Sequence, residues 1–232
     1  MRNLLLPNEL MFDWEKTQKI IIAFIKKQFN DNNLNKVIIG LSGGVDSSVT
    51  ATLAVEALGK QNVIGVLLHE KGVTPNQDVI DSKNLIKQLG IHHKSIIINP
   101  IIEKYESIIR NLINKQDNEL FNRFGYANLK SRIRMNLLYV ESNINTPSIV
   151  IGTGDKSEIL IGYCTKYGDH GVDILPIGDL YKSQVQFLAK KMELPESIWE
   201  KPPSPALLKN QNAETEIGIN YFLIDKILYY LI

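Results

Sequence analysis

The stretch VIIGLSGGVDSSVTATL, residues 37–53, indicates the fold before any other part of the chain is considered. An apolar, β-branched run typical of a buried strand ends in Ser42-Gly43-Gly44, and an apolar run that favours a helix follows. Adjacent glycines cost backbone entropy that an ordinary turn avoids, so the chain must need a bare backbone here. Backbone N–H groups, serine hydroxyls and a helix N-terminus together form an anion site. The stretch therefore predicts a strand–loop–helix unit that binds phosphate.

One acidic residue, Asp46, lies inside this loop and would repel a phosphate unless a cation lay between them. Mg²⁺ bridges carboxylate and phosphate oxygens, which makes Asp46 a predicted metal ligand. The motif GxxxxGK[ST] is absent because no lysine follows the glycines, and GxGxxG is absent too. The alternative is a plain glycine turn with Asp46 as a helix cap, but the complete string SGGVDSS favours the anion site.

The rest of the chain alternates between strand and helix signals. This order predicts an α/β fold in which a parallel sheet carries helices on both faces, in a Rossmann-like three-layer arrangement. Parallel strands bind ligands at their carboxyl ends, so SGGVDSS and the later GTGDKSE are expected at one edge. The predicted strands lie in residues 36–41, 62–68, 93–99 and 147–155, the last of which runs into a loop. The predicted helices are 9–29, 47–59, 78–90, 100–115, 128–142, 179–192 and 221–232.

Composition limits the classes of function. The 232 residues suit a single domain, 1–232, and the net charge of +1 gives no overall attraction to nucleic acid or membrane. A single cysteine, Cys164, excludes an internal disulfide and a thiolate metal cage. We find no signal peptide and no membrane-spanning run, and therefore expect a cytoplasmic protein that binds neither nucleic acid nor membrane.

A second polar region, residues 152–185, reads GTGDKSEILIGYCTKYGDHGVDILPIGDLYKSQV. Thr153 and Glu158 follow a predicted strand and lie within reach of the phosphate loop, and Lys182 opens the next helix. The glycines between them suggest a loop shaped around a ligand. A solvated surface loop whose charges pair with one another is the alternative that composition alone leaves open.

SGGVDSS resembles the signature of the N-type ATP pyrophosphatases, or PP-loop proteins, which split ATP between its α and β phosphates. GLSGGVDSS, NLKSRIRM, GTGDKSE, TKYGDHGVDILPIGDLYKSQV, KPPSPAL and ETEIG, in this order between residues 40 and 218, resemble the ammonia-dependent NAD synthetase family. The resemblance implies an adenine nucleotide alpha hydrolase-like fold and a homodimer. It also implies a Mg²⁺-dependent ligase that amidates deamido-NAD with ammonia, using ATP, through an acyl-adenylate.

The same resemblance implies roles for individual residues. Asp46, Glu158 and Lys182 would be catalytic, with Asp46 and Glu158 as the magnesium ligands. The alternatives are a solvated helix face for Arg132, a core position for Tyr139 and a plain turn for Ser204. The ATP-binding residues would be Gly40, Leu41, Ser42, Gly43, Gly44, Val45, Asp46, Ser47, Thr153, Lys182 and Ser204, and the deamido-NAD-binding residues Asn128, Arg132, Tyr139, Lys166 and Asp173.

Two departures from the family pattern stand out. Ser204 occupies a position where threonine is frequent, and the chain stops at YYLI where the family usually continues into a basic tail bearing a histidine. No glutaminase domain fits in this length, so we expect free ammonia as the nitrogen donor, and Asp169 and Asp173 are candidates to deprotonate ammonium. The rival functions are another PP-loop adenylating enzyme, either GMP synthetase-like or tRNA-modifying, and an inactive nucleotide-binding module.

Overall fold

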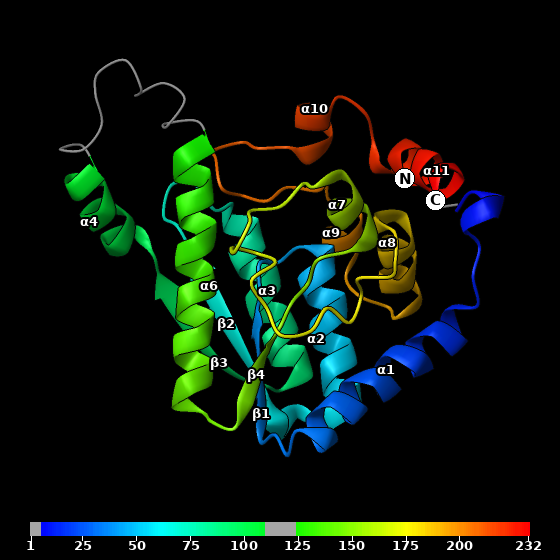
Figure 1. Cartoon of the computed structure of the whole chain (residues 1–232), viewed down its shortest axis with the longest axis horizontal. Coiled ribbons are helices and arrows are strands. Elements are labelled where there is room, and N and C mark those ends of the chain that lie inside the picture. The colour runs from blue at the N-terminus through cyan, green and yellow to red at the C-terminus, as the bar shows by residue number, and fades with distance from the viewer. Residues whose placement is uncertain (1–5, 110–123) are drawn as a thin grey trace.

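The computed structural model describes residues 6–109 and 124–232, and its centre is a parallel sheet between two layers of helices (Figure 1). Within the described residues the strand order is β3-β2-β1-β4. This arrangement confirms the predicted three-layer α/β fold. The strands are β1 (Lys36–Gly40), β2 (Val63–His69), β3 (His92–Ile97) and β4 (Ser148–Ile151).

The predicted helices are present with shifts at their ends, and three short helices at 156–161, 196–199 and 213–217 were not predicted. The signal at 9–29 divides into a short 3-10 turn and α1, which begins after Asp13 because that side chain accepts a hydrogen bond from the N–H of Lys16. The predicted helix 100–115 runs on into residues outside the described ranges. The helices are α1 (Trp14–Asp31), α2 (Val45–Leu58), α3 (Asn76–Leu89), α4 (Asn99–Ile109), α6 (Tyr126–Ile144), α7 (Lys156–Ile161), α8 (Lys182–Lys191), α9 (Glu196–Trp199), α10 (Ala213–Ile217) and α11 (Tyr221–Leu231), with 3-10 turns η1 (Asn8–Leu10) and η2 (Lys60–Asn62).

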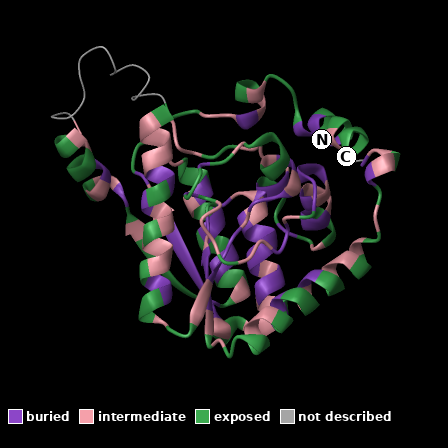
Figure 2. Cartoon of the chain, in the orientation of Figure 1, coloured by how far each residue is buried: buried purple, intermediate pink, exposed green. Residues whose placement is uncertain are grey.

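Alternate residues of β1 enter different cores, as the period of a strand requires. Val37 and Ile39 join the larger core with α1, α2 and α8, whereas Ile38 joins the core on the α6 side. Helices therefore lie on both faces of the sheet. Most of β1, most of β2 and much of α2 are buried, whereas β3, at the edge of the sheet, is largely exposed (Figure 2).

The polar start of α2 is compatible with this burial because its hydroxyls bond to its own backbone. Ser48 donates to the carbonyl of Gly44, and Thr50 donates to the carbonyl of Asp46, each at 2.8 Å. Such bonds to the preceding turn satisfy hydroxyls that have no access to water. The string SSVT can therefore continue directly from the loop into a central helix.

The sheet has its switch point between β1 and β4. The chain runs outward from β1 through β2 to β3 on one side, and β4 pairs with the other side of β1. Loops leaving the carboxyl ends of β1 and β4 therefore diverge and leave a crevice, which is where open α/β sheets bind ligands.

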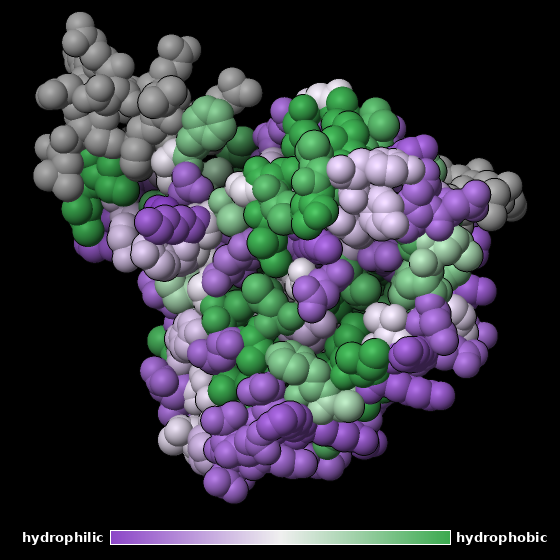
Figure 3. Space-filling view, turned by 45° about the vertical axis from the view of Figure 1, so that its right-hand side comes forward, coloured by the Kyte–Doolittle hydropathy of each residue, from purple (hydrophilic) through white to green (hydrophobic). Residues whose placement is uncertain are grey.

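Exposed apolar side chains occur on the outside as well. Leu160 of α7 and both Phe222 and Ile227 of α11 are exposed. Figure 3, which brings the α11 side of the molecule forward, shows hydrophobic side chains gathered in its upper part. None of the described helices has the length and apolar character that crossing a membrane requires.

Candidate functional site

The loop after β1 requires glycine at residue 43. Its backbone is left-handed (φ +79°), and a Cβ there would lie 2.2 Å from the carbonyl oxygen of Asp78 in α3. Two serines then brace the turn: the Oγ atoms of Ser42 and Ser47 lie 3.0 Å apart, and the N–H of Gly44 donates to Ser42 Oγ. The loop is thus held in shape at the N-terminus of α2, as the sequence predicts for an anion site.

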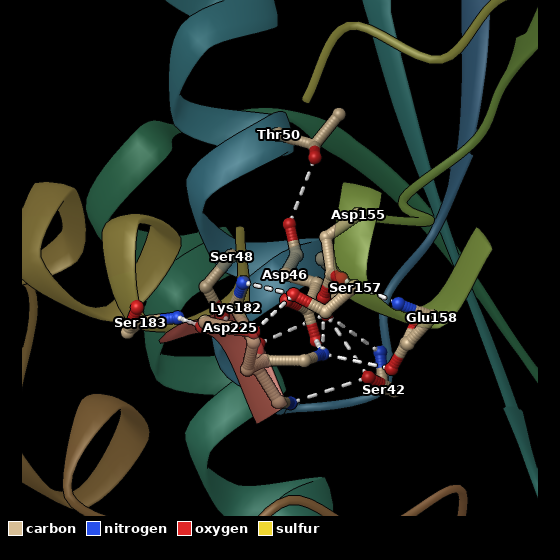
Figure 4. Close-up of polar contacts among 12 residues, drawn as sticks. Ser42, Asp46, Ser48, Thr50, Asp155, Ser157, Glu158, Lys182, Ser183 and Asp225 are labelled. Carbon is tan, nitrogen blue, oxygen red and sulfur yellow. Dashed lines mark hydrogen bonds and ion pairs between the residues drawn. The ribbon is translucent and has the colours of Figure 1, made fainter. Parts of the chain in front are cut away.

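Lys182 lies beside this loop at the centre of three carboxylates (Figure 4). Its Nζ is 2.8 Å from Asp46, 2.6 Å from Asp155 and 2.8 Å from Glu158, and only 1% of its side chain is exposed. Asp155 is fully buried and also caps α7, because its Oδ1 accepts from the N–H of Glu158 at 2.9 Å. Residues from α2, α7 and α8 thus meet in one buried ionic cluster.

The charges in this cluster do not balance. Burial raises the pKa of Glu158 to about 8 and also raises the pKa of Asp46, while the ammonium of Lys182 opposes both shifts. Burial alone would lower the pKa of Lys182, but the three carboxylates raise it well above its usual value. One ammonium faces three acids, so the cluster has room for further positive charge.

Magnesium fits this donor set. Oxygen atoms of Asp46, Asp155 and Glu158 lie within 4.8 Å of one another, and Asp46 Oδ1 is buried without a hydrogen-bond partner. Hard divalent cations prefer oxygen ligands of this kind. These three carboxylates could therefore hold a magnesium ion, and two of them, Asp46 and Glu158, are the predicted ligands.

The raised pKa of Glu158 predicts how stability depends on pH when a chelator removes metal ions. The pKa of Glu158 is about 8 in the folded protein against 4.5 as its ordinary value, so folding favours the protonated form. Its stabilising contribution is full below about pH 4.5 and is lost as pH rises through about 8. We expect the free energy of unfolding in urea to fall by about 1 kcal/mol or more between about pH 6 and 9. Glu158→Gln should remove most of this slope, and equal slopes in both proteins would contradict the prediction.

A cavity of about 460 Å³ opens next to the loop and the cluster. This volume lies within the range of roughly 300–1,000 Å³ that is usual for small-molecule sites. Apolar side chains of β2 and α6 line one part, and polar groups of the loop and residues 153–169 line another. A site of this composition suits a nucleotide, with its base against the apolar part and its phosphates at the loop.

Many of the predicted site residues lie together here. Asn128, from α6, accepts a hydrogen bond from the hydroxyl of Thr165 at 2.9 Å. Lys182 does not itself line the cavity, but it contacts Asp46 and Glu158, which do. Gly43, Gly44, Val45 and Ser47 complete the loop. The predicted residues that line the cavity are Gly40, Leu41, Ser42, Asp46, Asn128, Thr153, Glu158 and Ser204.

Four predicted substrate residues are not among those that line the cavity. Arg132 is exposed, and its Nε donates to the carbonyl of Lys166 at 3.1 Å. The hydroxyl of Tyr139 donates to Asp173 at 2.9 Å, and Asp173 also accepts from the backbone of Val150 at the end of β4. These contacts shape the rim of the site, and the binding roles of the four residues stay predictions.

Arg134 lines the cavity although the sequence did not single it out. Its Nε donates to the carbonyl of Leu68 at 2.9 Å, while its Nη1 is buried without a partner. Burial lowers the pKa of Arg134 to about 10, which leaves it charged at neutral pH. A charged donor inside the cavity is suited to an anionic or oxygen-rich ligand.

Residues 200–215 are tied to the phosphate loop by one lysine. Nζ of Lys201 donates to the carbonyl of Gly43 at 2.8 Å and to Asp78 of α3 at 2.7 Å. Ser204, three residues further on, lines the cavity. Lys201 therefore connects the phosphate loop and α3 to the segment that contains Ser204.

A braced anion loop at the switch point of a parallel sheet, with acids beside it, places the chain in the class of nucleotide-binding α/β proteins. Comparison with known proteins narrows this class. The sequence profile described as NAD synthase matches residues 17–232, so the chain belongs to the NAD synthase family.

Individual proteins to which the chain is similar have names that are consistent with this family. A protein from Staphylothermus marinus named NH(3)-dependent NAD(+) synthetase is 47% identical over 218 residues, which are 94% of this chain and 76% of the relative. A solved structure of NMN synthetase from Francisella tularensis has a TM-score of 0.84 at 32% identity and covers 94% of this chain and 87% of its own. An NH3-dependent NAD synthetase from Campylobacter jejuni, in complex with the nitrate ion, has a TM-score of 0.73 at 35% identity and covers 82% of this chain and 78% of its own.

Proposed function

We propose that this protein is a ligase that uses ATP to amidate deamido-NAD with ammonia, yielding NAD, AMP and pyrophosphate. The observation that carries the proposal is the meeting of Asp46 and Glu158 around Lys182 at the mouth of a nucleotide-sized cavity, in a chain of the NAD synthase family. Relatives named for this activity, at identities up to 47%, support it.

The proposed reaction has two steps. An oxygen of the nicotinate carboxylate attacks the α-phosphorus of ATP, the bond to the β-phosphate oxygen breaks, and pyrophosphate leaves with an acyl-adenylate formed. Ammonia then attacks the acyl carbon, AMP leaves with the electron pair of the broken C–O bond, and a base takes the surplus proton. Since two anions meet in the first step, the site must neutralise charge and align the reactants.

The chain's own groups divide this task. The loop that contains Gly43 and Gly44 would hold the pyrophosphate part of ATP, and the charge of Lys182 would offset the acids around it. Asp46 and Glu158 would hold Mg²⁺, which supplies positive charge to phosphate oxygens when bound. Arg134 and Asn128 project into the same cavity and would orient the rest of the nucleotide.

Pyrophosphate release measured with each substrate omitted in turn tests this function. We expect release to require ATP, deamido-NAD, ammonium and Mg²⁺ together, and NAD to form in equal amount. Glutamine in place of ammonium should give no NAD. Release that proceeds without deamido-NAD, or with an oxo-purine nucleotide or a tRNA as the acceptor instead, would favour another PP-loop adenylating enzyme. ATP binding without release would favour an inactive nucleotide-binding module.

The nicotinate mononucleotide is the second candidate substrate. The structural similarity to an NMN synthetase, at a TM-score of 0.84 over 94% of this chain, favours including it. Parallel assays with the mononucleotide and the dinucleotide decide between them. We expect the larger kcat/KM with deamido-NAD, because relatives at 44–47% sequence identity are named for NAD, whereas the NMN synthetase is 32% identical.

We also propose that the protein acts as a homodimer. Two amphipathic stretches could supply the interface, residues 9–29 and 118–142, and the helices there have exposed apolar residues: Ile20 on α1 and Val140 and Ile144 on α6. The second stretch begins outside the described residues. Light scattering after size-exclusion chromatography should give twice the 26.3 kDa of the chain. Ile144→Lys should shift the protein toward the monomer if α6 forms the interface, whereas a monomeric wild type would refute the proposal.

A further inference from the structure

The last helix, α11, contains one acidic side chain in the apolar sequence YFLIDKILYYL. This residue, Asp225, is fully buried. Burial raises its pKa, and an unpaired carboxylate at such a position strongly destabilises a fold. A buried acid of this kind persists where specific hydrogen bonds compensate for the lost hydration.

Both carboxylate oxygens of Asp225 accept such bonds. Oδ1 accepts from Ser157 Oγ at 2.5 Å, and Oδ2 accepts from the backbone N–H of Ser183 at 2.8 Å. Ser157 Oγ in turn accepts from the N–H of Lys182 at 2.8 Å. Because that N–H can only donate, the hydroxyl proton of Ser157 is free to point at Asp225, and every group in the chain of bonds is satisfied.

These bonds fix the start of α8. The first N–H groups of a helix lack partners within it, and here Ser157 and Asp225 supply partners for the N–H groups of Lys182 and Ser183. A negative charge at a helix N-terminus is also favourable to the helix dipole. The backbone that carries the Lys182 side chain is therefore held from α11 and α7 at once.

The same contacts connect to the ionic cluster. Ser157 lies in α7 between Asp155 and Glu158, so its hydroxyl joins the helix that carries two of the acids to the helix that carries the cation (Figure 4). On α11 the ring of Tyr221 lies 5.3 Å from Nζ of Lys182 and is 2% exposed. α11 thus covers Lys182 and also sets its backbone position.

We propose that Asp225 is a positioning residue that acts through Ser157 and the start of α8 to place Lys182 among Asp46, Asp155 and Glu158. Only the predicted effect on kcat depends on the proposed function; the positioning of Lys182 does not. Asp225 is not among the residues that line the cavity, so its effect should fall on kcat, with little change in KM for deamido-NAD. Substituting a residue that orients the active-site side chains typically lowers activity by about 10- to 100-fold.

Asp225→Asn tests the proposal with a side chain of the same volume. The two bonds are at different oxygens, and an amide has oxygen at only one of these positions, so either the Ser157 hydroxyl or the Ser183 N–H faces an NH2 donor instead of an acceptor. We expect kcat to fall at least about 10-fold. We also expect Lys182 in the substrate-free enzyme to react several-fold faster with an amine-selective reagent, measured by peptide mass spectrometry. The second readout needs no turnover, so it stays informative even if the proposed function is wrong.

Ile224→Val is the matched control, because it loosens the buried packing of α11 and leaves the polar network intact. It should change neither kcat nor the labelling of Lys182. Ser157→Ala should reproduce the effects of Asp225→Asn. Because both residues act through one network, the kcat of the double variant should be no more than about twofold below that of either single variant. Ser157→Ala also serves as the test if Asp225→Asn does not fold. Wild-type kcat and labelling in Asp225→Asn, or the same losses in Ile224→Val, would overturn the proposal.

Discussion

Replacing Lys182 with methionine is expected to abolish turnover and to lower the free energy of unfolding by roughly 3–5 kcal/mol. The substitution leaves Asp46, Asp155 and Glu158 facing one another with no cation, and Asp155 has no exposed surface. Such uncompensated burial is among the largest effects a single substitution has. Urea unfolding followed by tryptophan fluorescence gives the loss of stability, and the pyrophosphate assay gives the loss of activity.

This loss of stability should itself depend on pH. The ammonium of Lys182 lowers the pKa of Asp46 and of Glu158, so both groups should bind protons more readily in Lys182→Met than in the wild type. Protonation removes the repulsion, and the difference between variant and wild type should therefore shrink from about pH 8 to pH 5. Lys87→Met, on the exposed side of α3, is the control and should stay within about 0.5 kcal/mol of wild type. A Lys182→Met protein as stable as this control would contradict the interpretation of the cluster.

Asp46→Asn is the second substitution with a large expected effect: a folded protein whose magnesium-dependent turnover falls by about 100-fold or more. The amide keeps the volume of the carboxylate and can still accept from Lys182, so stability should change by about 1 kcal/mol or less. What it loses is negative charge at the oxygen that has no partner inside the protein. A metal's stabilisation of phosphoryl charge contributes several kcal/mol, which corresponds to factors of about 100 to 1,000 in rate.

Titration with Mg²⁺ separates this effect from general damage. In Asp46→Asn the half-saturating Mg²⁺ concentration should rise along with the loss of turnover, while the circular dichroism spectrum stays that of the wild type. Asp179→Asn, an exposed acid in the loop before α8, provides the control and should leave both quantities unchanged. Near-normal turnover in Asp46→Asn would remove Asp46 from the proposed magnesium site.

The sequence predicted the fold and the meeting of distant residues because both follow from a parallel sheet. Asp46 follows β1 and Glu158 follows β4, and adjacent parallel strands deliver their following loops to one edge. Glycine at residue 43 was likewise predictable, since its strand–turn–helix context requires a bare backbone. Strand order was not predicted, because apolar runs specify burial and not which strands are neighbours.

The direction in which individual side chains point could not be predicted from the sequence. Arg132 and Arg134 are two residues apart on α6, so they point to different sides, and only the packed structure shows that Arg134 enters the cavity. The role of Asp155 as a helix cap could have been predicted, because Asp-x-x-Glu at 155–158 is a pattern typical of a helix start. In the structure Asp155 does cap α7. The single acid in the apolar sequence of α11, Asp225, also indicated an unusual position. Its role depends on long-range hydrogen bonds to Ser157 and Ser183, which no local sequence pattern predicts.

The contribution of α11 has a consequence for biosynthesis. A nascent chain that has emerged only as far as α8 already contains the phosphate loop and all four members of the ionic cluster, yet it lacks the acceptor for the Ser157 hydroxyl and the Ser183 N–H. The ribosome must therefore deliver α11 before the start of α8 can be fixed. Competence for adenylation would then be acquired only after α11 has been synthesised.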